Sequence, residues 1–352
     1  MDHFIGLDGH KTSCTFVVLD PQAKVKRKAV IATEGQALAG FVKQVPGRRL
    51  LCTEEGSLSQ WLFEILHRHV HDMAIVHGRK QKGNKDDFRD ALDLANRMRT
   101  GDLGQRILKV PESLMCLKNL VQAYETLNKD VTRVKNRIKH RFRSRGIAMN
   151  SPAAKLLNQI AVQSVFAKNP GFKQSLLLLM EQQKKLEPLK EEAQQGMIAE
   201  AARHPITRIL KTAPGIGPIR SAELLAIVIT PFRFRTVRQF WAYCGLGIVQ
   251  RSSSDWVQQP GGGWVRAPVY QTRGLNRNFN HTAKAIFKGA AMTVICSRGE
   301  QPLRADYDRL LANGTKPNLA RLTLARKIAA IVLAMWKTQE GYDPEKHRMK
   351  QE

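Results

Sequence analysis

Acidic residues at several points of this chain have the types and spacing of a divalent-cation site. Asp8 ends one short apolar segment that favours a β-strand, and Glu54 and Glu55 end another. Asp87 and Asp90 lie three residues apart in a segment that favours a helix, so they share one helix face. If the ends of these strands meet the start of this helix, the carboxylate oxygens can bind Mg²⁺ or Mn²⁺. Two such ions can hold the attacking and leaving oxygens of a phosphoryl transfer.

Each acid taken alone has a plainer explanation. A surface position or a helix N-cap accounts equally well for Asp86 or Asp87. The order of the four acids along the chain, and the elements on which they fall, favour a shared metal site over four unrelated carboxylates.

The first hundred residues predict the elements that would position these acids. Apolar, β-rich runs and helical spacing predict strands at 4–8, 14–19, 24–33, 49–54 and 73–76, and helices at 36–44, 57–69 and 87–99. Three hairpin-linked strands followed by alternating helices and strands are typical of an RNase-H-like sheet.

The sequence in the middle of the chain predicts helices and no strands. Apolar residues recur at helical spacing from Leu127 to Phe142, and a second helical run spans Phe172–Ala201. We expect a helical hairpin or coiled coil, broken near residues 146–152. Residues 111–150 carry a net charge of +6, which favours contact with a phosphate backbone through Arg133, Lys135, Arg137, Lys139 and Arg141. A solvated helix face is the alternative explanation.

Charge indicates a polyanionic partner for the whole chain. The 352 residues include 57 Lys and Arg against 30 Asp and Glu, a formal net charge of +27, and +15 of it lies in residues 201–352. Nucleic acid is the first candidate and an anionic membrane surface the second. The sequence predicts no membrane span and no secretory signal. Five scattered cysteines disfavour disulfides and structural zinc, and favour a cytoplasmic protein.

Two further segments of the last part of the chain could carry function. Gly215 and Gly217 lie in a Pro-Gly-Ile-Gly turn between predicted helices, which is typical of a phosphate-binding helix-hairpin-helix. An ordinary turn between helices is the alternative. The run of 251–263 is rich in Gly, Ser, Trp and Gln and predicts a loop, in which Ser252, Ser253 and Ser254 could include a nucleophile.

These motifs, in this order, resemble the DEDD transposases of bacterial insertion sequences, relatives of the Piv-type DNA invertases that include the bridge-RNA-guided recombinases. The resemblance runs from about residue 4 to 337. It rests on Asp8, on Cys52-Thr53-Glu54, on the run from Asn84 to Ala91, on Ala213-Pro214-Gly215-Ile216-Gly217, and on Phe240-Trp241-Ala242-Tyr243-Cys244-Gly245-Leu246.

The resemblance implies a domain plan and a set of catalytic residues. It implies a RuvC-like catalytic domain at 1–110, a coiled coil at 111–201, and a mainly helical transposase domain with a helix-hairpin-helix at 202–352. The implied metal-binding tetrad falls on Asp8, Glu54, Asp87 and Asp90, and the implied nucleophile on Ser253. Apart from the resemblance, the positive charge of the nearby Arg251 could stabilise the phosphate oxygens of bound DNA. The family usually has Glu-x-x-Gly at the second acid, so Glu55 is an alternative to Glu54. The family serine is often followed by glycine, so Ser252 and Ser254 are alternatives to Ser253.

The resemblance also implies partners. They are double-stranded donor and target DNA, a non-coding guide RNA, and further copies of the chain in a homodimer or homotetramer, without a membrane. We therefore expect a bacterial, nucleoid-associated recombinase. One alternative is a Holliday-junction resolvase or nuclease that uses the same acids with water as nucleophile. A non-catalytic nucleic-acid-binding protein is the other, and it would need the charge but not the acids.

Overall fold

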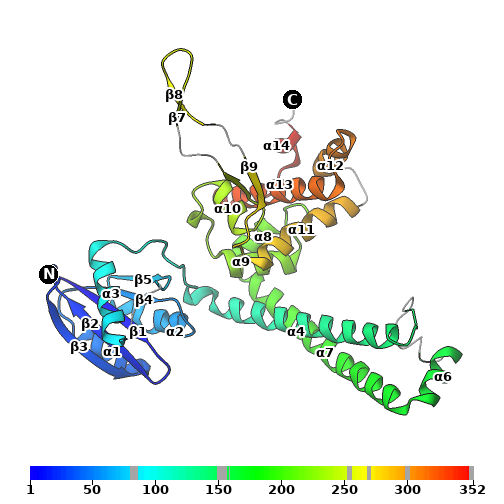
Figure 1. The fold of residues 1–352 in the computed structure, drawn as a ribbon, viewed down its shortest axis with the longest axis horizontal. Helices are drawn as coiled ribbons and strands as arrows, with labels where there is room; N and C mark the ends of the chain where they lie inside the picture. Colours follow the sequence, from blue (N-terminus) through cyan, green and yellow to red (C-terminus); the bar gives the residue numbers. More distant parts are fainter. Residues whose placement is uncertain are drawn as a thin grey trace. The chain divides into compact units, whose positions relative to one another are not determined.

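The structure is a computed structural model. It describes residues 1–79, 86–148, 157, 159–251, 256–267, 271–297 and 302–348. The chain divides into two compact units, Met1–Met115 and Cys116–Glu352. The first contains a mixed α/β fold and the second is mostly helical, as Figure 1 shows.

A five-stranded sheet forms the centre of the first unit. Its strands are β1 (Asp2–Gly9), β2 (Ser13–Leu19), β3 (Val25–Ala32), β4 (Arg48–Glu54) and β5 (Asp72–Val76). Their order in the sheet is β3-β2-β1-β4-β5. The first three strands pair antiparallel, whereas β4 lies parallel to both β1 and β5. The five predicted strands are therefore confirmed, each to within two residues at either end.

Helices cover both faces of this sheet. The helices α1 (Gly35–Lys43) and α2 (Ser59–Leu66, followed by a 3₁₀ turn at His67–His69) pack on one face, and α3 (Asp87–Thr100) packs on the other. Successive residues of a strand point to opposite faces. Thus Ile5 belongs to the core beneath α1 and α2, and Phe4 to the core beneath α3.

A glycine sets how closely α3 approaches β1. A Cβ atom on Gly6 would lie 1.8 Å from the carbonyl oxygen of Ala91 and 2.6 Å from the amide nitrogen of Ala95, both in α3. No other residue type fits at this position without moving the helix. Since Gly6 is two residues before Asp8, this contact places the start of α3 beside Asp8.

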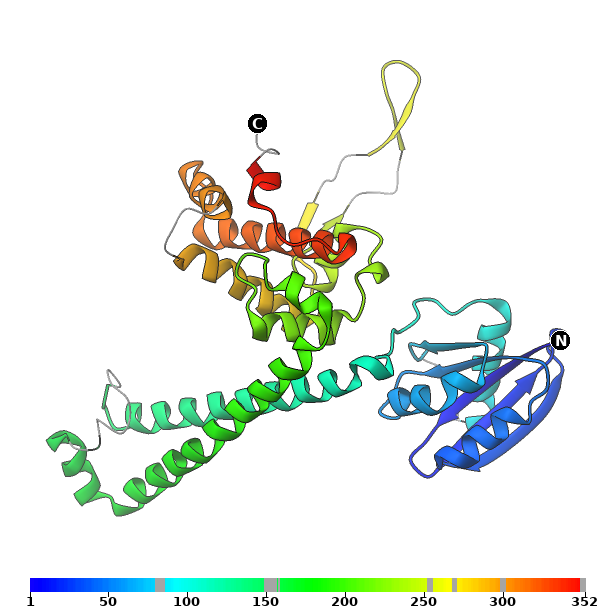
Figure 2. The ribbon, with the colours of Figure 1, turned by 180° about the vertical axis from the view of Figure 1, so that it is seen from behind.

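The second unit contains a long helical hairpin. It is formed by α4 (Glu112–Arg143), the short α6 (Ile160–Lys168) and α7 (Pro170–Ala202), and α4 and α7 run in opposite directions (Figure 2). A buried apolar cluster joins the three helices. It comprises Val134, Ile138, Phe142, Val162, Phe166, Phe172 and Leu176. The predicted apolar stripe of α4 is therefore confirmed.

The remainder of the second unit is mainly helical. Its helices are α8 (Pro205–Leu210), α9 (Pro218–Val228), α10 (Val237–Tyr243), α11 (His281–Cys296), α12 (Pro302–Ala312), α13 (Pro317–Thr338) and α14 (Pro344–Arg348), with a 3₁₀ turn at Pro231–Arg233. Among the described residues, no helix is both long enough and apolar enough to cross a membrane. All five cysteines are free.

Four short strands correct the sequence-based prediction for this region. Strands β6 (Ile248–Arg251) and β9 (Gln271–Leu275) pair antiparallel, and so do β7 (Trp256–Gln258) and β8 (Trp264–Arg266). The prediction of a loop over 251–263 is therefore wrong at Trp256–Gln258. Three-residue strands are too short to show alternation, and the glycines that suggested a loop form the turn of a β-hairpin.

Candidate metal centre

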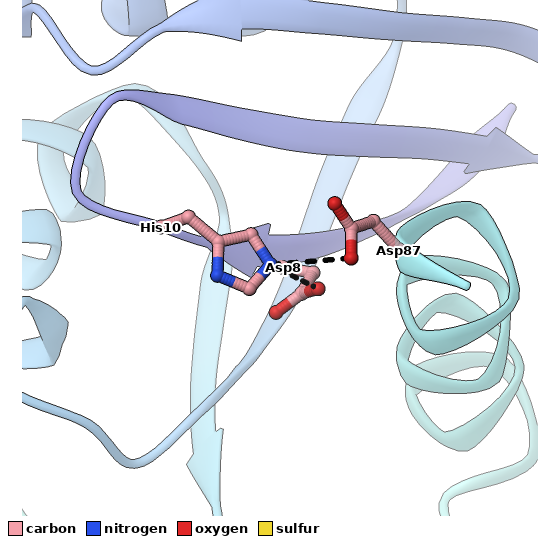
Figure 3. Close-up of side chains that lie close together, drawn as sticks. All are labelled: Asp8, His10 and Asp87. Carbon is pink, nitrogen blue, oxygen red and sulfur yellow. Dashed lines mark hydrogen bonds and ion pairs between the residues drawn. The ribbon is translucent and has the colours of Figure 1, made fainter. Parts of the chain in front are cut away.

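Asp8 lies near the end of the central strand β1, where it meets the start of α3. Figure 3 shows its carboxylate together with His10 and Asp87. His10 Nε2 is 3.0 Å from Asp8 Oδ2 and 3.4 Å from Asp87 Oδ1. Since a carboxylate accepts hydrogen bonds, the ring donates to Asp8 in the tautomer that carries its proton on Nε2. In the sequence, the only feature that marks His10 is its position in the turn after Asp8.

The first turn of α3 orients the acid pair. Asp86 is the N-cap, and its side chain accepts a hydrogen bond from the amide of Phe88 at 3.0 Å. The N-cap explanation therefore applies to Asp86 and leaves Asp87 free to face Asp8. Asp87 and Asp90 both lie in the first helical turn, as the three-residue spacing predicted. Carboxylates at a helix N-terminus are also favoured by the helix dipole.

Glu54 and Glu55 point in different directions. Glu54 ends β4, and Cys52, two residues earlier, is in the core beneath α3, so Glu54 is on the same face of the sheet as Asp8. Glu55 Oε2 instead lies 2.5 Å from the ammonium of Lys109 and accepts a hydrogen bond from the Ser59 hydroxyl at 3.1 Å. Glu54 is therefore the residue that faces the other acids, and Glu55 is held by its own ion pair.

The acids influence one another electrostatically. Burial raises the pKa of Asp8, the charges of Asp87 and Asp90 raise it further, and His10 opposes the rise. Burial also raises the pKa of Glu54, helped by the charges of Asp8 and Asp90, while Arg97 lowers it. Such a rise means that the ionised carboxylates repel one another in a partly desolvated place. A bound cation would relieve this repulsion.

This donor set fits a hard divalent cation. Ligand atoms of Asp8, His10 and Asp87 all lie within 4.8 Å of one another. Glu54 and Asp90 are outside this group, although the charge of Asp90 contributes to raising the pKa of both Asp8 and Glu54. Oxygen-rich sets of this kind suit Mg²⁺ and Mn²⁺. The structure thus brings Asp8 and Asp87 together, with His10 as a third group, and places Glu54 on the same face of the sheet.

The five predicted cations of α4 lie on both flanks of its buried apolar stripe. Arg133, Lys135, Arg137, Lys139 and Arg141 are all exposed. Several of them line one wall of an open groove of about 850 Å³, and the opposite wall comes from α7. Arg133 pairs with Asp130 at 3.0 Å and Lys135 with Glu187 at 2.9 Å. Within the described part of the chain, the other three cations form no ion pair.

The two glycines of the predicted helix-hairpin-helix have different surroundings. Gly215 has a φ of +73°, and a Cβ there would lie 2.4 Å from the carbonyl oxygen of Ala290 in α11. Its lack of a side chain is therefore needed for helix packing. Gly217 is the N-cap of α9, and a Cβ there would meet no atom within 4 Å. Only Gly217 leaves the open space that a phosphate would need.

The predicted nucleophiles cannot be placed. Ser252, Ser253 and Ser254 lie outside the described residues, and Arg251 is described only as the last backbone position of β6.

Comparison with known proteins gives three matches. A transposase family model named for the DEDD transposases of IS110 matches residues 5–144, which include all four acids. A second, described as the transposase IS116/IS110/IS902 family, matches residues 207–267. The chain is also similar to the insertion element IS110 uncharacterized 43.6 kDa protein of Streptomyces coelicolor, with 30% identity over 174 residues. That match covers 49% of this chain and 38% of the relative, so it spans less than half of either protein.

Proposed function

Because the chain belongs to the IS110 family of DEDD transposases, we propose that it is an enzyme that cuts and rejoins DNA strands when an insertion element moves. The observation that carries this proposal is the approach of Asp87 to Asp8 beside His10, with Glu54 on the same face of the sheet and Asp90 in the same helical turn as Asp87. The four acids come from two neighbouring strand ends and one helix start. A protein that only bound nucleic acid would have no use for repelling carboxylates in one place.

The catalytic domain that we propose is RuvC-like and spans residues 1–110. Its support is the strand order β3-β2-β1-β4-β5, with three antiparallel strands followed by two parallel ones. A coiled coil at 111–201 and a transposase domain at 202–352 complete the proposed domain plan.

The four acids are proposed to hold Mg²⁺ or Mn²⁺ near the scissile phosphate. When bound, such ions stabilise negative charge on the phosphate oxygens. The protein's own part is geometric. Gly6 allows α3 to bring Asp87 against Asp8, and the ion pair of Glu55 with Lys109 keeps the second glutamate out of the donor set. His10 forms a hydrogen bond with Asp8 and lies 3.4 Å from Asp87, so it holds its place beside both aspartates.

The proposed nucleophile is Ser253, with Ser252 and Ser254 as alternatives. Its hydroxyl oxygen attacks the phosphorus and loses its proton, and a DNA oxygen leaves with a proton as a free hydroxyl. The phosphodiester is thereby exchanged for a phosphoserine ester of similar energy. A DNA hydroxyl then attacks this ester, so strands are rejoined without ATP.

The proposed partners are donor and target DNA duplexes, a non-coding guide RNA, and further copies of the chain in a homodimer or homotetramer. The net charge of +27 and the exposed cations of α4 support binding to nucleic acid, in keeping with a protein of the bacterial nucleoid. The RNA and the oligomer rest on the family resemblance alone.

A covalent-adduct assay tests the proposal. The protein is incubated with its element-end DNA, any guide RNA and Mg²⁺, and then run on a denaturing gel. We expect a protein–DNA adduct that Ser253→Ala removes and that Ser252→Ala and Ser254→Ala retain. Asp87→Asn or Asp90→Asn should abolish cleavage while leaving DNA binding nearly intact. Cleavage with free ends and no adduct would favour a resolvase or nuclease that uses water instead.

A further inference from the structure

The hairpin β7–β8 carries two tryptophans that the proposed catalytic machinery does not use. Trp256 is 57% exposed and Trp264 is 61% exposed. Tryptophan is a costly residue to leave in water, because its ring carries a large apolar surface. The other three tryptophans of the chain are at least partly buried, at positions 61, 241 and 336. The two most exposed indole rings therefore belong to one hairpin, whose residues from Trp256 to Arg266 are all exposed.

The strand register places both rings on the same face of the hairpin. Trp256 pairs with Arg266, and Gln258 pairs with Trp264. Paired residues share a face, and alternate residues along a strand return to it. This face, which we call the indole face, therefore consists of Trp256, Gln258, Trp264 and Arg266. The opposite face carries the paired Val257 and Val265.

The composition of the indole face matches the chemistry of nucleobases. Flat indole rings stack on the π-faces of unpaired bases, and an arginine adds a cation–π contact and a hydrogen-bond donor to phosphate or base edges. Arg266 already lies over the ring of Trp256, with its guanidinium carbon 6.0 Å from the ring centroid. Gln258 can both donate and accept hydrogen bonds. From Trp256 to Ala267 the single charged residue is this arginine, so the hairpin does not repel phosphates.

We propose that the indole face binds unpaired bases of a DNA strand by stacking. DNA is the occupant favoured over RNA because the hairpin begins only three positions after the proposed nucleophile Ser253, which must meet the DNA strand that is cut. This inference thus rests on the proposed function. It adds a strand-separating contact: bases next to the cleavage point leave the duplex and stack on Trp256 and Trp264.

A binding experiment with matched variants tests the proposal. Full-length protein carrying Asp87→Asn, which should bind without cutting, is titrated against a fluorescent DNA duplex with a central unpaired bubble and against the same duplex fully paired. We expect tighter binding to the bubble. Trp256→Ala and Trp264→Ala should each weaken bubble binding by at least about fivefold, the lower end of what loss of one base-stacking ring costs. Affinity for the paired duplex should stay unchanged.

The controls come from the same hairpin. Val257→Ala with Val265→Ala alters the opposite face and should leave the bubble preference intact. Trp264→Phe keeps a ring that can stack and should retain most of the affinity that Trp264→Ala loses. A loss in the alanine variant without recovery in the phenylalanine variant would mean that the hairpin fold, rather than stacking, had been measured, and would overturn the proposal.

Three other results would also overturn it. Equal loss of bubble and duplex binding would make the hairpin a general contact. Tryptophan-dependent binding of an RNA loop without the same effect on DNA would assign the face to RNA. A change of oligomeric mass in the tryptophan variants would assign it to a second copy of the chain. Failure of the proposed function can be distinguished from these results. In that case the wild-type protein would not cut DNA, although binding to the bubble would still depend on the tryptophans.

Discussion

Replacing Gly6 by alanine tests whether the contact between α3 and β1 builds the metal centre. The added Cβ would lie 1.8 Å from the carbonyl oxygen of Ala91, whereas ordinary contacts begin at 3.4 Å. The obstacle is helix backbone, which cannot rotate away, so the start of α3 must retreat by about 1.6 Å. Asp87 and Asp90 move with it, because both lie in the first turn of α3.

This displacement is large on the scale of metal coordination. Mg²⁺ holds its oxygen ligands at about 2.0–2.1 Å and tolerates little deviation. A misplacement of about 1 Å can cost roughly 10²-fold in rate. We therefore expect Gly6→Ala to reduce Mg²⁺-dependent DNA cleavage at least about 100-fold. Overpacking of this kind costs about 1–3 kcal/mol of folding free energy, so much of the protein should still fold.

The assay measures cleavage per folded molecule, with the folded fraction taken from thermal unfolding. Gly56→Ala is the matched control, because a Cβ at Gly56 meets no atom within 4 Å although that residue lies just after the glutamate pair. The control should cut at the wild-type rate. A folded Gly6→Ala protein that also cuts at the wild-type rate would refute the argument that this glycine sets the position of the acids.

Three further predictions concern other charged groups. Glu54→Gln should abolish cleavage and Glu55→Gln should retain it in the same gel assay, because Glu55 is already held by an ion pair. Burial and a neighbouring glutamate raise the pKa of Glu223 to about 7, so Glu223→Gln should raise the free energy of unfolding by up to about 3 kcal/mol above that pH. The gain should vanish below pH 4.5, where the glutamate is protonated both folded and unfolded. Arg137→Gln with Arg141→Gln should reduce the slope of log affinity against log salt by about 2 in DNA-binding titrations.

Each of these has an outcome that contradicts it. If the Glu55→Gln protein had normal stability but did not cut DNA, Glu55 would have to be counted among the metal ligands. If Glu223→Gln raised the free energy of unfolding equally at acidic and alkaline pH, the shape of the side chain, rather than its charge, would limit stability at this position. An unchanged salt slope would mean that the exposed cations of α4 do not touch phosphate.

Local patterns predicted the elements but not the contacts between them. The strands of the sheet and the start of α3 at Asp87 follow from alternation, helical spacing and capping, which involve neighbouring residues only. The tight approach at Gly6 joins residues 85 positions apart, and no local pattern marks it. Similarly, Lys109 reaches Glu55 from 54 positions away, so the choice between the two glutamates needed the three-dimensional structure.

The least predictable parts were those where residue type misleads. Glycine and glutamine between 251 and 263 are typical of loops, yet Gln258 lies in a strand and the glycines 261–263 connect the two strands of a hairpin. His10 looked like an ordinary turn residue, because its role depends on Asp87 lying within reach of the same nitrogen. Gly215 suggested phosphate binding, whereas its surroundings explain it by close packing against α11.

The pairing of β6 with β9 has a consequence for how this chain can vary. Arg251 and Gln271 are partners in that ribbon, so the two ends of the segment between them are fixed at adjacent positions. A segment anchored in this way can be lengthened, shortened or exchanged without changing the distance between its two ends. The tryptophan hairpin is therefore a natural site for grafting: a chimaera could take this segment from a relative and change DNA handling while the helical core keeps its architecture.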